Sequence, residues 1–293
     1  MSIPNPAACA ARRPPLSAAL LLLAGLAVPL QAEAARAQPP LRRVPALLPA
    51  LPAPLAPAVR AEDGTKEGRA ALSAASSAKR TAQKLEGEER DGALAAVAVK
   101  YAGIAGTESF TASERAEAAF RGGEVLRTLD KASEADAQFA RAVELGEDTE
   151  SGREFAGRGL LERAHMKRRA DDADGALALY AEVSRRFADQ RRTAAHARTW
   201  SGKLLLKAGR LDEAAKQLLG FAETFPEFAA EAVRNADLLA VAQVEAGDET
   251  AARATVERLR RELEPVMAKG DKVSDETQAA LDNLRVTELL GGY

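Results

Sequence analysis

Apolar positions return along most of this chain at a nearly fixed distance, each time with the same residues around them. A small residue recurs at intervals of 41, 38 and 38 positions, a larger apolar residue follows four positions after each, and another small residue stands twelve before. An offset of four residues lies on one helical face, and a small residue on a preceding helix lets two helices approach closely. In order, the sets are Gly123, Ala135 and Phe139; Ala164, Ala176 and Tyr180; Gly202, Ala214 and Leu218; and Ala240, Ala252 and Val256.

A period of this length is typical of stacked helix pairs, so we expect an all-α fold, an α-solenoid of antiparallel pairs. In the clearest pair, the first helix should run from about residue 193 to 208 and end at Gly209. The second should begin near Leu211 and end before Pro226, because glycine and then proline are helix stop signals. The following pair should end in the same way before Pro265.

The ends of the array are less regular than its middle. Residues 62–110 should form N-terminal helices that amount at most to a degenerate repeat, and the repeats proper should span residues 111–265. They begin at a capping box formed by Thr111 and Glu114. Residues 266–293 are expected to hold one capping helix, from about 274 to 290, that covers the open end of the array. Strands are not expected, since alternating β-branched runs are lacking.

The segment from Gly202 to Pro226 carries, in order, a glycine, the sequence Gly-x-x-x-x-Ala, apolar residues and a proline. It resembles a tetratricopeptide repeat (TPR), and the other three units resemble it at their small and apolar positions. They lack the proline, and the period is longer than the ~34 residues usual for the family. The resemblance covers about residues 111–265 and implies a TPR-like superhelix, but it does not identify the ligand. The leading interpretation is a non-enzymatic scaffold that binds a partner protein.

The N-terminal region has the composition of an export signal. Arg12 and Arg13 precede an apolar run from Leu16 to Leu30, and an Ala-x-Ala cleavage site ends at Ala34. The run is shorter than the ~20 apolar residues of a membrane-spanning helix. We therefore predict a signal peptide over residues 1–34, with an uncleaved anchor as the alternative. The expected location is periplasmic or secreted, and the chain would then resemble exported TPR proteins of the cell envelope.

Residues 35–61 are rich in proline and alanine, and proline prevents helix formation because it lacks the amide donor. We expect a disordered or extended linker there. The only cysteine, Cys9, would leave with the signal, so disulfides and thiolate metal sites are excluded from the mature chain. A formal net charge of −2 gives no general attraction to nucleic acid. Neither a phosphate loop nor a nucleophile motif is present, and we expect no catalytic residues, metal or cofactor.

The middle of the array is basic. Residues 153–203 contain 12 Arg or Lys against 7 Asp or Glu. The TPR resemblance implies that the first helix of each pair lines a concave groove, and a basic groove attracts an anionic ligand. We expect this groove to bind an acidic or carboxylate-bearing segment of a partner protein or peptide. The groove residues expected from this comparison are Arg158, His165, Arg168, Arg169, His196, Lys203, Lys207 and Arg234.

Other interpretations remain open from sequence. The basic residues could be solvated helix faces, and the two histidines could form a metal or acid–base pair, although polar groove residues fit better because no His-x-x-x-His spacing occurs. The chain could instead be a structural or assembly subunit of a cell-envelope complex. A hydrolase of envelope polymers would need a carboxylate such as Glu124 or Asp237 in an apolar pocket. The sequence does not define the oligomeric state.

Overall fold

The structure is a computed structural model that describes residues 64–268 and 275–291. The expected signal peptide and linker, residues 1–61, lie outside the described residues. All regular structure in the described part of the chain is helical, as predicted, and all of it belongs to one compact unit, Leu55–Tyr293. The helices are α1 (Lys66–Ala82), α2 (Gly87–Gly106), α3 (Ala112–Thr128), α4 (Ala132–Gly146), α5 (Gly152–Arg169), α6 (Ala173–Arg186), α7 (Arg191–Lys207), α8 (Leu211–Leu218), α9 (Phe221–Thr224), α10 (Ala229–Glu245), α11 (Glu249–Ala268), α12 (Asp275–Asp282) and α13 (Arg285–Leu289), with a 3₁₀ turn at Pro226–Phe228.

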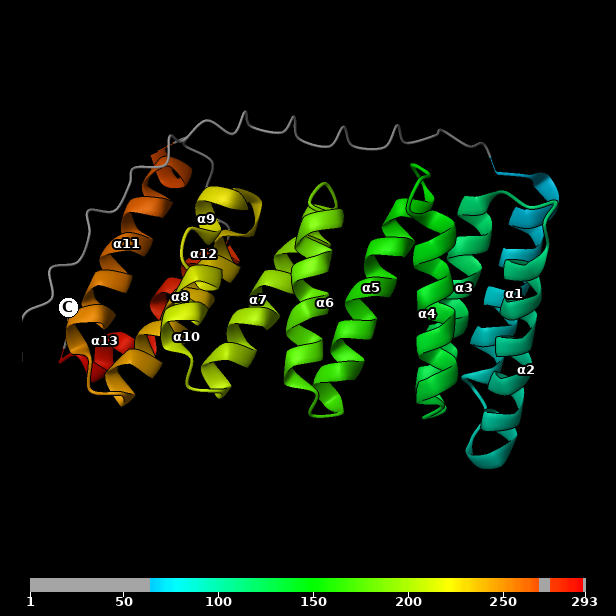
Figure 1. Cartoon of the computed structure of the whole chain (residues 1–293), viewed down its shortest axis with the longest axis horizontal. Helices are drawn as coiled ribbons and strands as arrows, with labels where there is room; N and C mark the ends of the chain where they lie inside the picture. Colours follow the sequence, from blue (N-terminus) through cyan, green and yellow to red (C-terminus); the bar gives the residue numbers. More distant parts are fainter. Residues whose placement is uncertain (1–63, 269–274, 292–293) are drawn as a thin grey trace, which may run out of the picture. The chain divides into compact units, whose positions relative to one another are not determined.

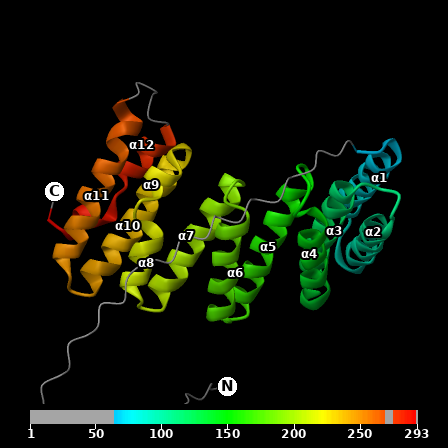
Figure 2. The same cartoon turned by 45° about the horizontal axis from the view of Figure 1, so that its top comes forward.

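The helices form antiparallel pairs that follow one another in chain order (Figures 1 and 2). From α1 to α8 each helix packs against its neighbour in the sequence, and α10 packs against α11. The first helices of successive pairs also touch: α1 with α3, α3 with α5, α5 with α7, and α7 with α10. The apolar core is accordingly a series of clusters, each shared by neighbouring pairs. This arrangement confirms the predicted solenoid of helix pairs, and residues 66–106 form a pair of their own, α1 with α2.

A left-handed residue closes the first helix of four successive pairs. It lies five positions before the recurring alanine of each pair (Ala135, Ala176, Ala214 and Ala252), which we call the anchor alanine. The four residues are Asp130, Asp171, Gly209 and Gly247, with φ of 56°, 57°, 71° and 85°. The amide of the next residue donates to the carbonyl five positions back, as in Lys131 to Leu126 at 3.0 Å. This bond satisfies a carbonyl that the helix end would otherwise leave unpaired. Glycine adopts the conformation without strain, and aspartate is among the few other residues that tolerate it.

The small residues of the repeat allow the two helices of a pair to approach closely. All eight of them are buried. A Cβ atom on Gly202 of α7 would collide with the side chain of Leu218 of α8. The pairing partner of the glycine is therefore the larger apolar residue four positions after the anchor alanine.

The pair that begins with α7 differs from the prediction, because its second helix is broken into α8 and α9. Gly220 has φ of 71° at the break, and charged side chains of neighbouring helices bind the backbone groups that the break frees. Arg198 of α7 donates to the carbonyls of Gln217 and Leu219, while the carboxylate of Glu262 of α11 accepts the Gly220 amide at 2.7 Å. The sequence pattern of the pair holds, but its second helix changes direction.

Two expectations for the C-terminal part were wrong. Pro265 lies inside α11, three residues before its end, where its missing amide removes only one hydrogen bond of the last turn. Residues 275–289 form two short helices in place of one capping helix. The buried carboxylate of Asp237 of α10 accepts the Val286 amide at 3.0 Å, which starts α13 anew and ties it to the last full pair.

Candidate binding surface

The eight side chains expected to line the groove all come from the first helices of three successive pairs. Arg158, His165, Arg168 and Arg169 lie on α5, the residues His196, Lys203 and Lys207 lie on α7, and Arg234 lies on α10. None of the eight is fully buried. We call the face of α5, α7 and α10 that carries them, together with the adjoining helix α3, the first-helix surface.

The first-helix surface contains a cavity of about 530 Å³ that is lined by residues of α3, α5 and α7. Its floor includes Phe120, and the guanidinium of Arg158 lies over this ring with Cζ 4.4 Å from the ring centre. Arg158 also forms an ion pair with Glu154 at 3.3 Å. Because Glu154 and other carboxylates line the same space, the cavity is mixed in charge.

Both histidines border this cavity, and both are held in the neutral form. His165 Nδ1 lies 2.8 Å from the hydroxyl of Tyr180. Burial, followed by the charges of Arg168 and Arg169, lowers the pKa of His165 to about 4. Burial also lowers the pKa of His196. Within the described residues no group of three or more His, Cys, Asp or Glu side chains is arranged to hold a metal ion. The lowered pKa values favour neutral imidazoles at neutral pH.

A second cavity, of about 290 Å³, lies between the C-terminal ends of α5 and α7; we call it the α5–α7 cavity. Trp200 forms one wall, with the Arg168 Cζ atom 4.2 Å and the Lys203 Nζ atom 5.0 Å from its ring centre. Cations over an aromatic face are attracted by the ring quadrupole. Lys207 and Asp171 also line the cavity and lie 4.0 Å apart.

Arg168 and Lys203 have no ion-pair partner among the carboxylates of residues 64–268 and 275–291. Each is half-buried, and burial, followed by the charge of Arg234, lowers the pKa of Lys203. Their charges thus lie beside the same Trp200 ring and form no ion pair within the described residues.

The remaining predicted cations have other surroundings. Arg234 pairs with Glu276 at 3.0 Å and with Glu231 at 3.6 Å, so its charge is offset within the chain. Arg169 is exposed and lines a separate cavity between α3 and α5 together with Arg127. The structure therefore brings together Arg168, Lys203 and Lys207 but places Arg158, Arg169 and Arg234 at other points of the surface.

Trp200 was interpreted from sequence as a packing residue, and its role beside two cations was missed. Its place in the repeat offers the signal that could have shown this, since position 200 follows Glu162 by one period of 38 residues. A tryptophan at a repeat position where the preceding unit has a carboxylate changes the charge of that site.

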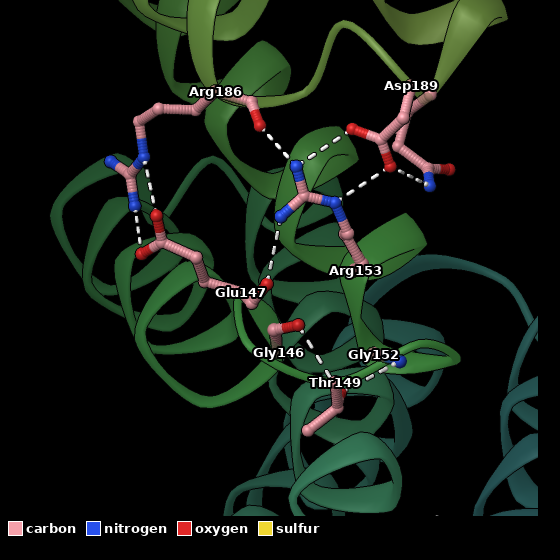
Figure 3. Close-up of polar contacts among 8 residues, drawn as sticks. Gly146, Glu147, Thr149, Gly152, Arg153, Arg186 and Asp189 are labelled. Atoms are coloured by element: carbon pink, nitrogen blue, oxygen red, sulfur yellow. Dashed lines mark hydrogen bonds and ion pairs between the residues drawn. The ribbon is translucent and has the colours of Figure 1, made fainter. Parts of the chain in front are cut away.

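The connections between pairs were also missed. Arg153, at the start of α5, donates from Nε and from one Nη atom to the Asp189 carboxylate at 2.7 and 2.8 Å, and it binds the carbonyls of Glu147 and Arg186 (Figure 3). Arg186 in turn forms an ion pair with Glu147. We call this set the connector cluster.

One period of 38 residues later, Arg191 binds Glu227 and the Thr224 carbonyl in the same manner. Each of the two arginines thus bonds a carboxylate 36 positions ahead of it and a carbonyl 33 positions ahead. This regular offset was visible in the sequence. It joins the start of a pair's first helix to the end of its second helix, and so sets where the next pair begins.

No family model matches the sequence, and no curated protein matches it. Similar solved structures include a kinesin light chain-like protein of Podosopora anserina with nearly identical TPR-like repeats, a variant of that protein with one substitution, and BtubC (BKLC) from P. vanneervenii. The substituted variant has a TM-score of 0.48 at 13% identity over 70% of this chain and 99% of its own. The unsubstituted protein gives 0.46, 13%, 71% and 100%, and BtubC gives 0.45, 14%, 71% and 94%. No helix of the described residues is long and apolar enough to cross a membrane.

Proposed function

We propose that this protein is a non-enzymatic scaffold whose first-helix surface binds an acidic segment of a partner protein. The observation that carries the proposal is the pair of half-buried cations, Arg168 and Lys203, that flank Trp200 without a carboxylate partner among the described residues. Charge that a protein does not neutralise itself is available to a ligand, and complementary charge on the partner raises the association rate and the specificity.

The helical-repeat framework supports this function physically. The cations project from α5 and α7, whose connection is held by the bidentate bond between Arg153 and Asp189. A surface built on packed helices is ordered before the partner arrives, so binding costs little conformational entropy on the side of the scaffold. Exposed basic residues next to half-buried ones extend the attraction beyond a single contact.

The proposal includes export to the periplasm or the outside of the cell and association with the cell envelope. Export is supported by the basic start, the apolar run and the Ala-x-Ala site of residues 1–34. The chain would then act on partners in that compartment, where a cysteine-free protein depends on packing alone for its stability.

A peptide-binding measurement tests the function. The full chain would be titrated into a fluorescein-labelled peptide that is rich in Asp and Glu and has capped ends, and the anisotropy of the peptide would be recorded. The control peptide has the same sequence with every Asp replaced by Asn and every Glu by Gln. Only the acidic peptide should bind. The double variant Arg168→Glu and Lys203→Glu should weaken binding by at least about tenfold. Arg185→Glu, on the exposed side of α6, is the matched control and should bind as the unaltered chain does. Equal binding of both peptides, or no effect of the double variant, would refute the proposal.

A further inference from the structure

Two cavities of the protein occupy equivalent places in successive repeats. The α3–α5 cavity, of about 480 Å³, is lined by Arg127, Asp130 and Ala132, whereas the α5–α7 cavity is lined by Arg168, Asp171 and Ala173. Each residue of the second set follows its counterpart by 41 positions. The backbone agrees, because both aspartates are the left-handed turn residues, with φ of 56° and 57°. The two sites can therefore be compared position by position.

The two arginines share one unusual feature and differ in another. The Nε atoms of Arg127 and Arg168 are both buried without a hydrogen-bond acceptor in the described part of the chain. Beside Arg127, however, lies a carboxylate, since the Glu162 Oε2 atom is 3.5 Å from its Nε. The residue one period after Glu162 is Trp200, and its ring lies against the Arg168 guanidinium. Arg127 therefore has a carboxylate beside it, whereas within the described residues Arg168 has an aromatic ring in that place and no ion pair.

Arg168 uses part of its donor set within the protein, since its Nε atom is buried and its side chain interacts with the Tyr180 hydroxyl, so a ligand can accept only from its remaining N–H groups. A guanidinium that lies over a ring directs its N–H groups outward in its own plane, where an oxyanion can accept from two of them at once. The ammonium of Lys203 is held against the same ring. Lys207 and Asp171 lie 4.0 Å apart and offset each other. The α5–α7 cavity thus offers two positive charges that form no ion pair within the described residues, although the charge of Glu231 acts on Lys203.

We propose that the α5–α7 cavity binds a phosphate monoester carried by the acidic partner segment, with Arg168 and Lys203 as its ligands. A phosphate monoester has a charge of about −1.5 to −2 at neutral pH and three strong acceptor oxygens, whereas a carboxylate has one charge and two oxygens. The dianion matches the two unbalanced cations, and a single carboxylate leaves one of them unpaired. This inference rests on the proposed function and adds the chemical group that anchors the partner.

The structure supplies a local reporter for the test, because Trp200 is the only tryptophan of the chain. The full chain would be titrated with three capped acidic peptides that differ at one position, which is phosphoserine, glutamate or serine, while tryptophan emission is recorded. The phosphoserine peptide should change the emission saturably and bind at least about tenfold more tightly than the glutamate peptide. A separate titration with inorganic phosphate should give the same change at higher concentration, since the peptide adds contacts outside the cavity.

Variants locate the site. Arg168→Gln and Lys203→Gln should each weaken phosphopeptide binding by at least about tenfold, whereas Arg185→Gln should not change it. Trp200→Glu introduces the carboxylate found at the equivalent position of the α3–α5 cavity and should abolish binding, while Trp200→Phe should keep it. These variants are compared by anisotropy of a labelled phosphopeptide, and unchanged helicity in circular dichroism shows that each is folded.

The outcomes separate the inference from the proposed function. If the glutamate and phosphoserine peptides bind equally well, and the Arg168→Glu and Lys203→Glu double variant weakens both, the phosphate assignment is wrong while the acidic scaffold stands. If the phosphopeptide and inorganic phosphate change the Trp200 emission but phosphate-free acidic peptides do not bind, the phosphate site stands. The proposed recognition of general acidity is then wrong.

Discussion

The ring of Phe139 on α4 lies directly against the backbone of Gly123 on α3, so closely that a Cβ atom on the glycine would be 2.7 Å from the Phe139 Cδ1 atom. Both residues are completely or almost completely buried. The contact joins the two positions that recur in every repeat, the small residue of the first helix and the larger apolar residue of the second. It shows that helix spacing within a pair is fixed by the absence of a side chain.

Replacing this glycine should therefore destabilise the pair. Gly123→Ala is expected to lower the free energy of unfolding by about 1–3 kcal/mol, because the added methyl group displaces a fully packed ring. Gly103→Ala is the control, since a Cβ atom there meets nothing within 4 Å. In a helix interior this control should be neutral or stabilising by up to about 1 kcal/mol. Urea unfolding measures both, and an equal effect of the two substitutions would contradict the packing argument.

The left-handed turn residues make a second prediction. Gly209→Val should destabilise the protein by about 1–2 kcal/mol, since a β-branched residue is strained at the φ of 71° found there. Gly209→Asp should cost less, because Asp130 and Asp171 occupy the equivalent positions of two other pairs. Thermal unfolding of the two variants compares them directly. A Val variant as stable as the Asp variant would show that the turn relaxes to a different conformation.

His165 should make stability depend on pH. In the unfolded chain its imidazole takes up a proton near its ordinary pKa of 6.5, whereas in the folded protein burial and the neighbouring arginines keep the pKa at about 4. The unfolded state therefore binds more protons between these values, and stability is lost as the pH falls from 6.5 toward 4. The loss should be about 1–3 kcal/mol.

His165→Gln should remove this part of the pH dependence while keeping a polar group near the Tyr180 hydroxyl. The free energy of unfolding would be measured for both chains at about pH 7 and about pH 4.5. The unaltered chain should lose more stability than the variant between the two values. Identical losses, or an NMR titration that gives His165 an ordinary pKa, would show that the imidazole is solvated.

Asp189 of the connector cluster should also make stability depend on pH, in a more acidic range than His165. Arg153 lowers the pKa of Asp189 below its ordinary 3.8 through their hydrogen bonds. A depressed carboxyl pKa contributes stability above the ordinary value, and this contribution is lost as the pH falls through the folded-state pKa. Asp189→Asn should cost up to about 1 kcal/mol at neutral pH, since the carboxylate is half-exposed. The difference from the unaltered chain should shrink below pH 3.8. A difference that is constant with pH would assign it to packing.

The break between α8 and α9 depends on Glu262. This carboxylate is 5% exposed and accepts the amide of Gly220 and the Nε–H of Arg258. Glu262→Ala should destabilise the protein by about 1–3 kcal/mol, because the buried amide loses its acceptor and the void stays unfilled. Glu262→Gln retains an acceptor oxygen and should lose less. Chemical denaturation measures the free energy of unfolding of both variants. Equal losses of stability would mean that the charge of Glu262, and not its acceptor oxygen, stabilises the break between α8 and α9.

Much of the architecture could be predicted from the sequence because it depends on local periodicity. The anchor alanines, the small residues before them and the stop signals at Gly209 and Gly247 define paired helices without reference to the rest of the chain. The same reasoning failed at Pro265 and at residues 274–290. Helix ends there depend on long-range partners such as the Asp237 carboxylate, which no local pattern specifies.

The candidate site was likewise predictable from the sequence only in part. Sequence reasoning located the basic residues on the first helices, since that requires only the helical register and the order of the pairs. It could not show which cations are neutralised, because the carboxylate beside an arginine comes from another helix, as Glu162 does for Arg127. By itself the sequence determined an all-helical array with a basic middle. Only the tertiary structure decided that Arg168 and Lys203 lie beside Trp200 without an ion pair to any described residue, because packing between successive pairs determines each side chain's neighbours.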